Sequence, residues 1–480
     1  MTPSAVARRA TSTPTPSPTP APLPTATPEP PSIAIPRLQA LLKANPNDQE
    51  AMTELAGQYL SINRPDLTLA LTRHLLQAGD KTAQVYFIDG YAQQALGQIA
   101  AAIDDLEQAS TLDPTNVEVL GNLANLYLAV NQPMDAERIA KRAVTFNKTN
   151  PDAYMALGSV YAAESHYDDA RIQFEQAFTL DTTSAKPLYS IAQTYVAQNN
   201  IPMALQSIDR ALAVDPNSVD ALSFKAQLYA RQHDVTHATE AYDDAAVAAP
   251  TDEQKVAIEI EKAEFYSSAH LDPQALAVYQ QLMTQYPSVS LVYVGYGAYL
   301  AAEKHDMTGA VAQWRKALTI DPDQTDALRD MGQYDLQSNR ANDAIVALRH
   351  LVTVEPTAEN YAFLAEAYNE LHQYALQREA CKDSFAIKRT PETLGCIGGA
   401  DFELHNYREA GQIFEALDFY AKGYLDRDPD LLYIAARTYT TLHQKDKAID
   451  AYQRLLALTP RGSAAYKKLQ KALADLNRGH

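Results

Sequence analysis

Residues 151–184 read PDAYMALGSVYAAESHYDDARIQFEQAFTLDTTS, and their pattern returns every 34 residues in the neighbouring sequence. One tyrosine and two alanines keep fixed places in four successive copies. These residues are Tyr127, Tyr161, Tyr195 and Tyr229; Ala136, Ala170, Ala204 and Ala238; and Ala143, Ala177, Ala211 and Ala245. A period of this length predicts a stack of identical supersecondary units, each in contact with its neighbours, rather than one globular core.

The pattern within residues 151–184 predicts two helices. Apolar or small residues three and four positions apart form two stripes on either side of residues 164–166: Tyr154, Leu157, Gly158 and Tyr161, then Ala170, Phe174 and Ala177. Such spacing is typical of amphipathic helices. We expect the small Gly158 to meet the small Ala170 where the helices cross, while large aromatic residues fill the remaining volume.

The turn inside each unit has its own signature. Its fifteenth position holds Asn63, Gly97, Asn131, Ser165, Asn199, His233, His270, Lys304, Asn339, His372, Asn406 and His443. Gly, Asn and His tolerate the left-handed backbone conformation that ends a helix. His233 and His237 have the spacing of a metal-binding pair, but the shared turn position favours a structural role for His233. We predict no metal site and no cofactor.

The pattern divides the chain into four segments. We expect a disordered Pro/Thr/Ser-rich tail at residues 1–35, a capping helix at 36–48, twelve helix pairs at 49–462 and a second capping helix at 463–480, with the weakest repeats at 358–428. The expected pairs start near Gln49, Ala83, Val117, Pro151, Ala185, Val219, Val256, Ser290, Thr325, Ala358, Glu392 and Pro429.

Composition narrows the class of partner. A net charge of −19 disfavours nucleic acid as the main ligand and favours basic partners. No run of 18 apolar residues is present, so no membrane-spanning helix is expected. Arg8-Arg9 is followed by Thr, Pro and Ser rather than by an apolar export segment. The lack of a recognisable signal favours the cytoplasm, with an exported or periplasmic protein as the alternative.

These residues resemble the tetratricopeptide repeat family, whose unit is a 34-residue helix–turn–helix. The resemblance covers roughly residues 36–476, and two departures are Lys225 in place of an apolar residue and Gln93 in place of tyrosine. It implies an all-α, right-handed α-solenoid whose first helices line a concave groove. On that resemblance, a peptide would contact Phe87, Tyr91, Asn125, Tyr189, Gln193, Gln227, Arg329, Gln333, Tyr433 and Arg437.

The function predicted from the sequence is a non-catalytic scaffold that binds a protein or an extended peptide. Two alternatives stay open: an assembly factor of the cell envelope tethered through its Pro-rich tail, and a substrate-selecting subunit of an enzyme complex. The two cysteines, Cys381 and Cys396, fall in adjacent units and are compatible with two buried thiols or with a disulfide. The sequence makes no prediction of oligomeric state.

Overall fold

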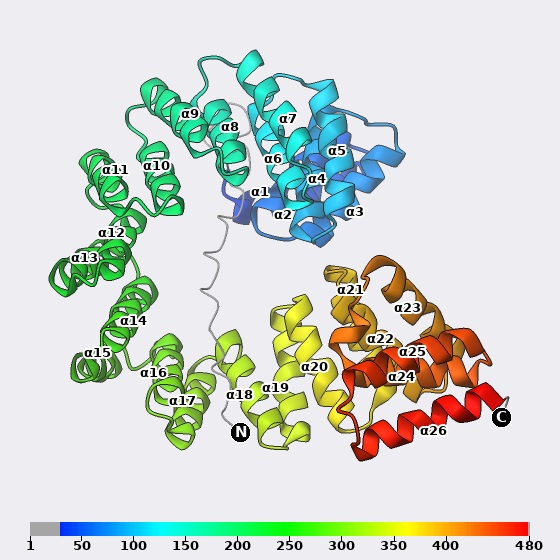
Figure 1. The fold of residues 1–480 in the computed structure, drawn as a ribbon. Coiled ribbons are helices and arrows are strands. Elements are labelled where there is room, and N and C mark those ends of the chain that lie inside the picture. The colour runs from blue at the N-terminus through cyan, green and yellow to red at the C-terminus, as the bar shows by residue number, and fades with distance from the viewer. Residues whose placement is uncertain (1–28, 479–480) are drawn as a thin grey trace. The chain divides into compact units, whose positions relative to one another are not determined.

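The structure is a computed structural model that describes residues 29–478 of the chain. Within that range it contains 26 α-helices and one 3₁₀ helix, and no strand. The chain divides after Ala248 into two compact parts, which we call unit 1 (described residues 29–248) and unit 2 (residues 249–478). Each unit is an all-α solenoid built from helix pairs (Figure 1).

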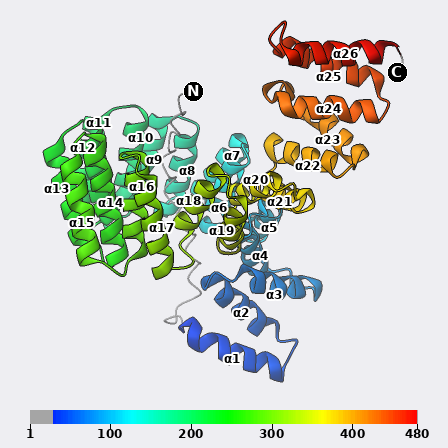
Figure 2. The ribbon, with the colours of Figure 1, turned by 90° about the horizontal axis from the view of Figure 1, so that it is seen from below.

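Unit 1 contains one lone helix and six helix pairs. The helices are α1 (Pro31–Ala44), α2 (Gln49–Ser61), α3 (Pro65–Gln77), α4 (Ala83–Ala95), α5 (Ile99–Leu112), α6 (Val117–Ala129), α7 (Pro133–Phe146), α8 (Pro151–Ala163), α9 (Tyr167–Leu180), α10 (Lys186–Ala197), α11 (Ile201–Val214), α12 (Val219–Arg231) and α13 (Val235–Ala248). Figure 2 shows α1, α2 and α3 following one another at the start of this unit.

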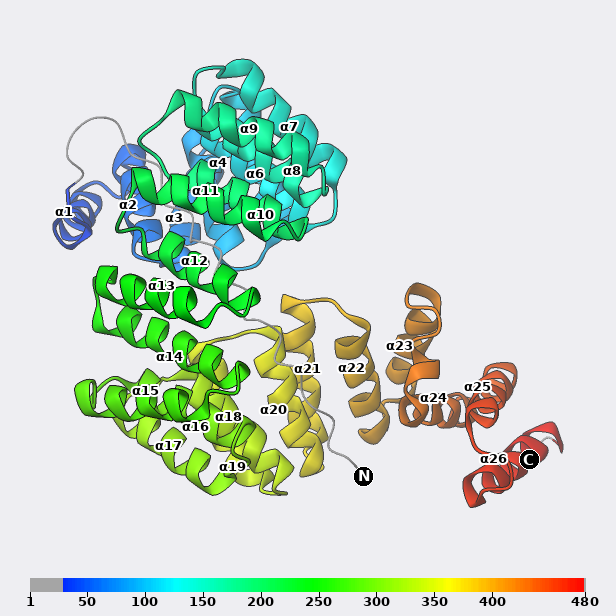
Figure 3. The same ribbon diagram turned by 60° about the vertical axis from the view of Figure 1, so that its left-hand side comes forward.

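Unit 2 contains six further helix pairs and a final lone helix. The helices are α14 (Asp252–Ser268), α15 (Asp272–Gln285), α16 (Ser290–Ala302), α17 (Met307–Ile320), α18 (Thr325–Gln337), α19 (Ala341–Val354), α20 (Ala358–Glu370), α21 (Tyr374–Ile387), α22 (Pro391–Glu403), α23 (Tyr407–Tyr420), η1 (Leu425–Arg427), α24 (Pro429–Thr441), α25 (Lys445–Leu458) and α26 (Ala464–Arg478). Figure 3 shows α22 to α26 in chain order.

Side-chain caps start many of the first helices. Asp48, Thr82 and Asn116 each accept a hydrogen bond from a backbone amide in the first turn of α2, α4 and α6, respectively. Such a cap satisfies an amide that has no partner inside the helix. The capping residue recurs with the period, which explains why most helices begin where the sequence predicts.

The turns inside the pairs confirm the role of the histidines. Eleven residues other than glycine have positive φ in the described chain: Asn63, Asn131, Ser165, Asn199, His233, His270, His305, Asn339, His372, His405 and His443. With Gly97, they give one left-handed residue to each pair. Two predictions were wrong, because the left-handed residue is His305 rather than Lys304 and His405 rather than Asn406.

Four helix boundaries differ from the prediction. Helices predicted to start at Pro36, Ala185, Val256 and Glu392 start at Pro31, Lys186, Asp252 and Pro391. Beginning α22 one residue earlier moves its turn to His405. In α1, the helix continues through Pro36 because the buried Ala34 packs with Ala51 and Leu55 of α2. Residues 1–28 of the predicted tail lie outside the described residues.

A small residue facing a large one sets the distance between paired helices. A Cβ atom built on Gly158 would lie 2.5 Å from the ring of Phe174, so the ring occupies the space beside the glycine. Gly398 faces Phe414 in the same way, with a Cβ-to-ring distance of 3.0 Å. The ring of Phe174, from the second helix, thus supplies the atoms that lie nearest to the space beside Gly158.

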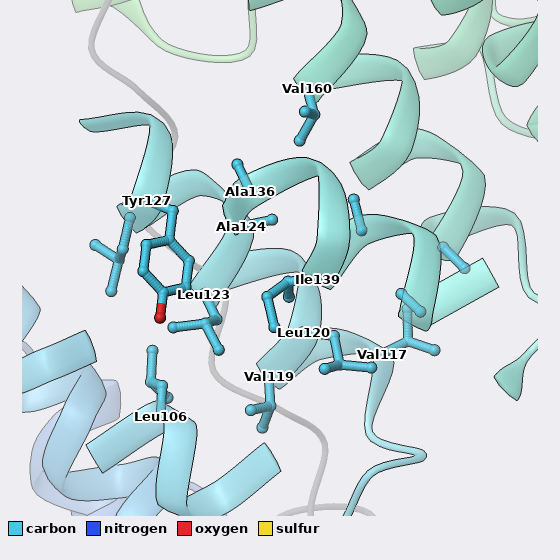
Figure 4. Close-up of a cluster of buried hydrophobic side chains, with 14 of the residues drawn as sticks. Leu106, Val117, Val119, Leu120, Leu123, Ala124, Tyr127, Ala136, Ile139 and Val160 are labelled. Atoms are coloured by element: carbon cyan, nitrogen blue, oxygen red, sulfur yellow. The ribbon is translucent and has the colours of Figure 1, made fainter. Parts of the chain in front are cut away.

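The same packing repeats along the stack. In Figure 4 the ring of Tyr127 lies beside Leu123, with its hydroxyl directed toward the helix of Leu106. That hydroxyl donates a hydrogen bond to Glu107, which follows Leu106 in α5. Burial raises the pKa of Tyr127 to about 12, and the bond to Glu107 contributes. Tyr127 thus ties α6 to α5, the second helix of the preceding pair.

Candidate peptide-binding surface

The ninth position of the 34-residue repeat forms a row on the first helices α4, α6, α8, α10 and α12 of unit 1. The row contains Tyr91, Asn125, Ser159, Gln193 and Gln227, which are 34 residues apart. Equal places in a repeat lie on equal faces of their helices, so these side chains follow one another along the stack. Four of the five belong to the residues predicted from the sequence to line a groove.

Adjacent first helices contact one another close to this row. Asn122 of α6 donates a hydrogen bond of 2.7 Å to Gln94 of α4. The rings of Tyr189 in α10 and Phe224 in α12 lie 5.1 Å apart between centroids. These contacts place neighbouring first helices close enough for one extended chain to cross several of them.

The residues of the row differ in how exposed they are to a partner. Asn125 and Gln193 are exposed, whereas Tyr91 is only 5% exposed. The ring of Tyr91 packs on Phe87, and its hydroxyl lies 3.5 Å from Glu118. Burial, with Glu118 nearby, raises the pKa of Tyr91. The structure therefore places Tyr91 in the core of unit 1 rather than on an open surface.

The predicted residues of unit 2 are engaged within the protein. Arg329 pairs with Asp326 and with Glu355, at 2.6 Å each. The guanidinium of Arg437 lies over the ring of Tyr433 at 5.9 Å, and Gln333 is half-buried. The ten predicted residues are therefore divided between the two units, and the exposed ones among them are Asn125 and Gln193 of unit 1 and Arg437 of unit 2.

Comparison with family models matches this repeat pattern directly. Models described as tetratricopeptide repeat match residues 94–160, 189–253, 151–183 and 429–461. The chain is a tetratricopeptide repeat protein. Proteins with these repeats act in general as protein-interaction scaffolds without catalysis of their own, and they typically bind proteins or peptides.

Solved structures similar to this tetratricopeptide repeat protein include yeast Tom70, with 14% identity and a TM-score of 0.44 over 78% of this chain and 92% of that chain. MamA is 23% identical, with a TM-score of 0.29 over 33% of this chain and 93% of that chain. YrrB is 24% identical, with a TM-score of 0.32 over 38% and 95%, respectively. The comparison with curated proteins finds no match.

The tetratricopeptide repeats also form a cleft that the sequence did not predict. Residues of α9, α10 and α11 line it, and its volume is about 540 Å³. Arg171 lies over the ring of Tyr195 at 4.3 Å, while Arg210 pairs with Glu175 at 2.6 Å. Second helices supply most of this lining, so a search restricted to first helices could not find it.

Two special contacts join α21 and α22 of the tetratricopeptide repeat protein. Cys381 and Cys396 form a disulfide, with their Cα atoms 5.9 Å apart. Arg378 pairs through Nε with Oδ1 of Asp401 at 2.5 Å, and the Asp401 side chain is only 1% exposed. Asn406 also donates a hydrogen bond of 3.0 Å to Asp401. The least regular repeats thus contain a covalent bond and a buried ion pair.

The histidine pair of the sequence does not meet as a metal pair. His233 is the left-handed turn residue, and Nδ1 of His237 lies 2.7 Å from Asp234. That bond, together with the backbone amide of His237, lowers the pKa of Asp234. Across residues 29–478, no three His, Cys, Asp or Glu side chains are grouped as metal ligands. In the same range no helix has the length and apolar character needed to cross a bilayer.

Proposed function

We propose that unit 1 binds an extended peptide along the row of ninth residues, without catalysis. The observation that carries the proposal is the pair of exposed amides, Asn125 and Gln193, at equal places of the repeat. A primary amide can donate to and accept from a peptide backbone, which suits recognition of an extended chain. Tyr189, half-buried against Phe224, supplies an aromatic surface on the same set of helices.

Acidic residues beside the row favour a peptide with basic side chains. The second positions of the same repeats hold Gln84, Glu118, Asp152, Lys186 and Asp220. Three of these five are acidic, in a chain with a net charge of −19. Their field attracts Lys and Arg on a partner and adds to the rate of association.

Selection of peptides tests this function. A random peptide library would be selected on the full chain, and the affinity of the recovered peptides measured by calorimetry. We expect Asn125→Ala with Gln193→Ala to weaken binding by roughly tenfold, because two hydrogen bonds are lost. Gln108→Ala, an exposed amide on the second helix α5 and outside the cleft of α9–α11, is the matched control and should leave affinity unchanged. Equal loss in both variants, or loss in neither, contradicts the proposed surface.

A second candidate is an exported assembly factor, and the disulfide between Cys381 and Cys396 favours it. Structural disulfides persist mainly in oxidising compartments. Thiol titration of the protein, purified anaerobically and without blocking agents from its native source, separates the two cases. No reactive thiol after denaturation supports export, whereas two thiols per chain support a reducing compartment.

A further inference from the structure

A polar network replaces part of the apolar packing between α3, α4 and α5. Thr72 stands where the following repeats have Leu106, Ala140, Phe174 and Ile208; Asp89 stands where they have Leu123, Leu157 and Ile191; and Gln93 stands where they have Tyr127, Tyr161, Tyr195 and Tyr229. The three residues are therefore a coordinated departure from the repeat, at positions that are apolar or aromatic in the neighbouring units.

These side chains contact one another and a second carboxyl group. The hydroxyl of Thr72 is hydrogen-bonded to Oδ1 of Asp89, and the amide of Gln93 donates to Oδ2 of the same residue. The same amide nitrogen donates to Oδ2 of Asp105 in α5, at 2.6 Å. One amide group therefore bridges two carboxyl groups, which brings those groups together.

The network lies almost entirely away from water. Thr72, Asp89 and Gln93 are 0%, 2% and 7% exposed, and Asp105 is half-buried. Two ionised carboxylates at such a site would repel one another and would both lose hydration. The Oε1 atom of Gln93 has no hydrogen-bond partner among the described residues, so the amide is oriented to serve the carboxyl groups.

Among the described residues, the groups that act on Asp105 are acidic or uncharged. Asp105 is faced by Asp89 and Gln93 from α4 and by Asp104 from its own helix. From α3, Thr72 faces Asp89, while its neighbours Arg73 and His74 are exposed. Acidic and phenolic groups of α6 and α7 are bonded elsewhere: Glu118 to Tyr91, Tyr127 to Glu107, and Asp135 to Arg138. In α2, Tyr59 accepts a bond from Gln39.

We propose that Asp89 and Asp105 share one proton in the folded protein, so that the packing of α3, α4 and α5 weakens when that proton is lost. The proton belongs to the pair rather than to one residue, as for other carboxyl groups in contact. It converts a repulsion into a hydrogen bond and makes the start of unit 1 sensitive to pH.

The direction of the pH effect follows from the raised pKa of Asp105. Burial, followed by the contact with Asp89, raises the pKa of Asp105 to about 7. A carboxyl group with a raised pKa in the folded state stabilises the protein fully below its unfolded pKa, and this contribution is lost as pH rises through the folded value. The stability of α3–α5 should therefore fall between about pH 4 and about pH 8.

Hydrogen exchange of the full chain at about pH 5.5 and about pH 8, corrected for intrinsic rates, tests the proposal alongside thermal unfolding. In the wild type, we expect the amides of α3–α5 to lose protection as the pH rises. We also expect the midpoint of the first thermal unfolding transition to decrease by roughly 2–4 °C over the same range. Asp105→Asn should remove this dependence, because it replaces a shared proton with a permanent amide. Asp104→Asn removes an exposed charge that makes only the last of the contributions to the raised pKa of Asp105, and should keep the dependence.

Two results would overturn the shared proton. One is a pH dependence in Asp105→Asn equal to that of the wild type. The other is stabilisation of the wild type, and not of Asp105→Asn, by added Ca²⁺ at about pH 8, which would make the pair a cation site. Should the variant fail to fold, the infrared band of protonated carboxyl groups in the wild type decides, since it must decline as pH rises through about 7.

Discussion

The repeats α8–α11 of unit 1 and the repeats α20–α23 of unit 2 have the same helix pairs but hold them in different ways. In the first region, Gly158 and Phe174 fit by size, and the recurring apolar positions supply the interior. In the second, Gly398 and Phe414 fit in the same manner, but a disulfide and the buried pair of Arg378 and Asp401 are added. Specific bonds accumulate where the repeat pattern is weakest.

The comparison shows that a stretch of sequence can depart from the repeat pattern and still form the same helix pairs. The pattern of residues 358–428 departs from the repeat, yet α20 to α23 form helix pairs like the others. A solenoid depends on contacts between neighbours, so a weak interface can be compensated locally without a change elsewhere. The following predictions test whether the added bonds carry stability or only accompany ordinary packing.

The largest effect is expected from the matched substitutions Phe174→Ala and Phe414→Ala. Both rings are buried, at 2% and 0% exposed, and each faces a glycine. Each loss should lower the free energy of local unfolding by about 3–5 kcal/mol, because a cavity replaces a large ring. Hydrogen exchange of each helix pair measures it, with the exposed Ile172→Ala as control. A much smaller loss for Phe414→Ala would mean that the added bonds, not packing, hold α22 and α23.

Reduction of the disulfide should have the next largest effect. Cys381 and Cys396 are 15 residues apart in sequence. A cross-link over a loop of this length stabilises by about 3 kcal/mol. We expect reductant to increase exchange in α20–α23 while α8–α11 stay protected. The double variant Cys381→Ser with Cys396→Ser should no longer respond to reductant. Unchanged exchange on reduction would show that the repeat packing is sufficient.

Two arginines allow a buried ion pair to be compared with an exposed one. Arg378→Gln leaves the carboxylate of Asp401 buried with Asn406 as its remaining partner, and should cost about 2 kcal/mol. Arg210→Gln breaks a pair whose side chains are 42% and 46% exposed, and should cost less than about 1 kcal/mol. Hydrogen exchange in each region, measured at increasing denaturant concentration, gives the free-energy cost of both substitutions. Equal costs would remove the distinction between the two regions.

A smaller effect than that of the aromatic rings or the disulfide is expected at the turns, where the regions should agree. His233 and His372 have φ values of 57° and 56°. Replacing either residue with Val should cost about 1–2 kcal/mol, because a branched side chain disfavours the left-handed conformation. His→Asn at the same positions should be nearly neutral. A large loss with Asn at either turn would mean that the imidazole itself has a role there.

Much of the fold was predictable because the information is local and repeated. The period, the capping residues and the turn residues each recur, so Asn131 or Pro151 can be placed without tertiary knowledge. Predictions failed where packing outweighs local preference, as at the start of α1, where the buried Ala34 extends the helix past Pro36. The one-residue shift at His405 likewise follows from the earlier start of α22.

The candidate surface was less predictable, since exposure depends on neighbours. Tyr91 and Asn125 occupy equal places in the repeat, but the ring of Tyr91 turns onto Phe87 and is buried while Asn125 is exposed. Gln93 was visible in the sequence as a departure from tyrosine. Its meaning required Asp89 and Asp105 from two helices, a contact that no single-residue pattern reveals.

The shared 34-residue period has a consequence for the length of the chain itself. Asn116 and Asn150 both cap the helices that follow them, one period apart. Removing residues 117–150 would therefore place Asn116 directly before Pro151, in the position that Asn150 now occupies. One capping residue would remain, and every later turn would stay in register. We expect whole-period deletions and duplications in regular repeats to preserve folding while shortening or lengthening the run of first helices. Recombination can therefore change the length of the solenoid in steps of one repeat.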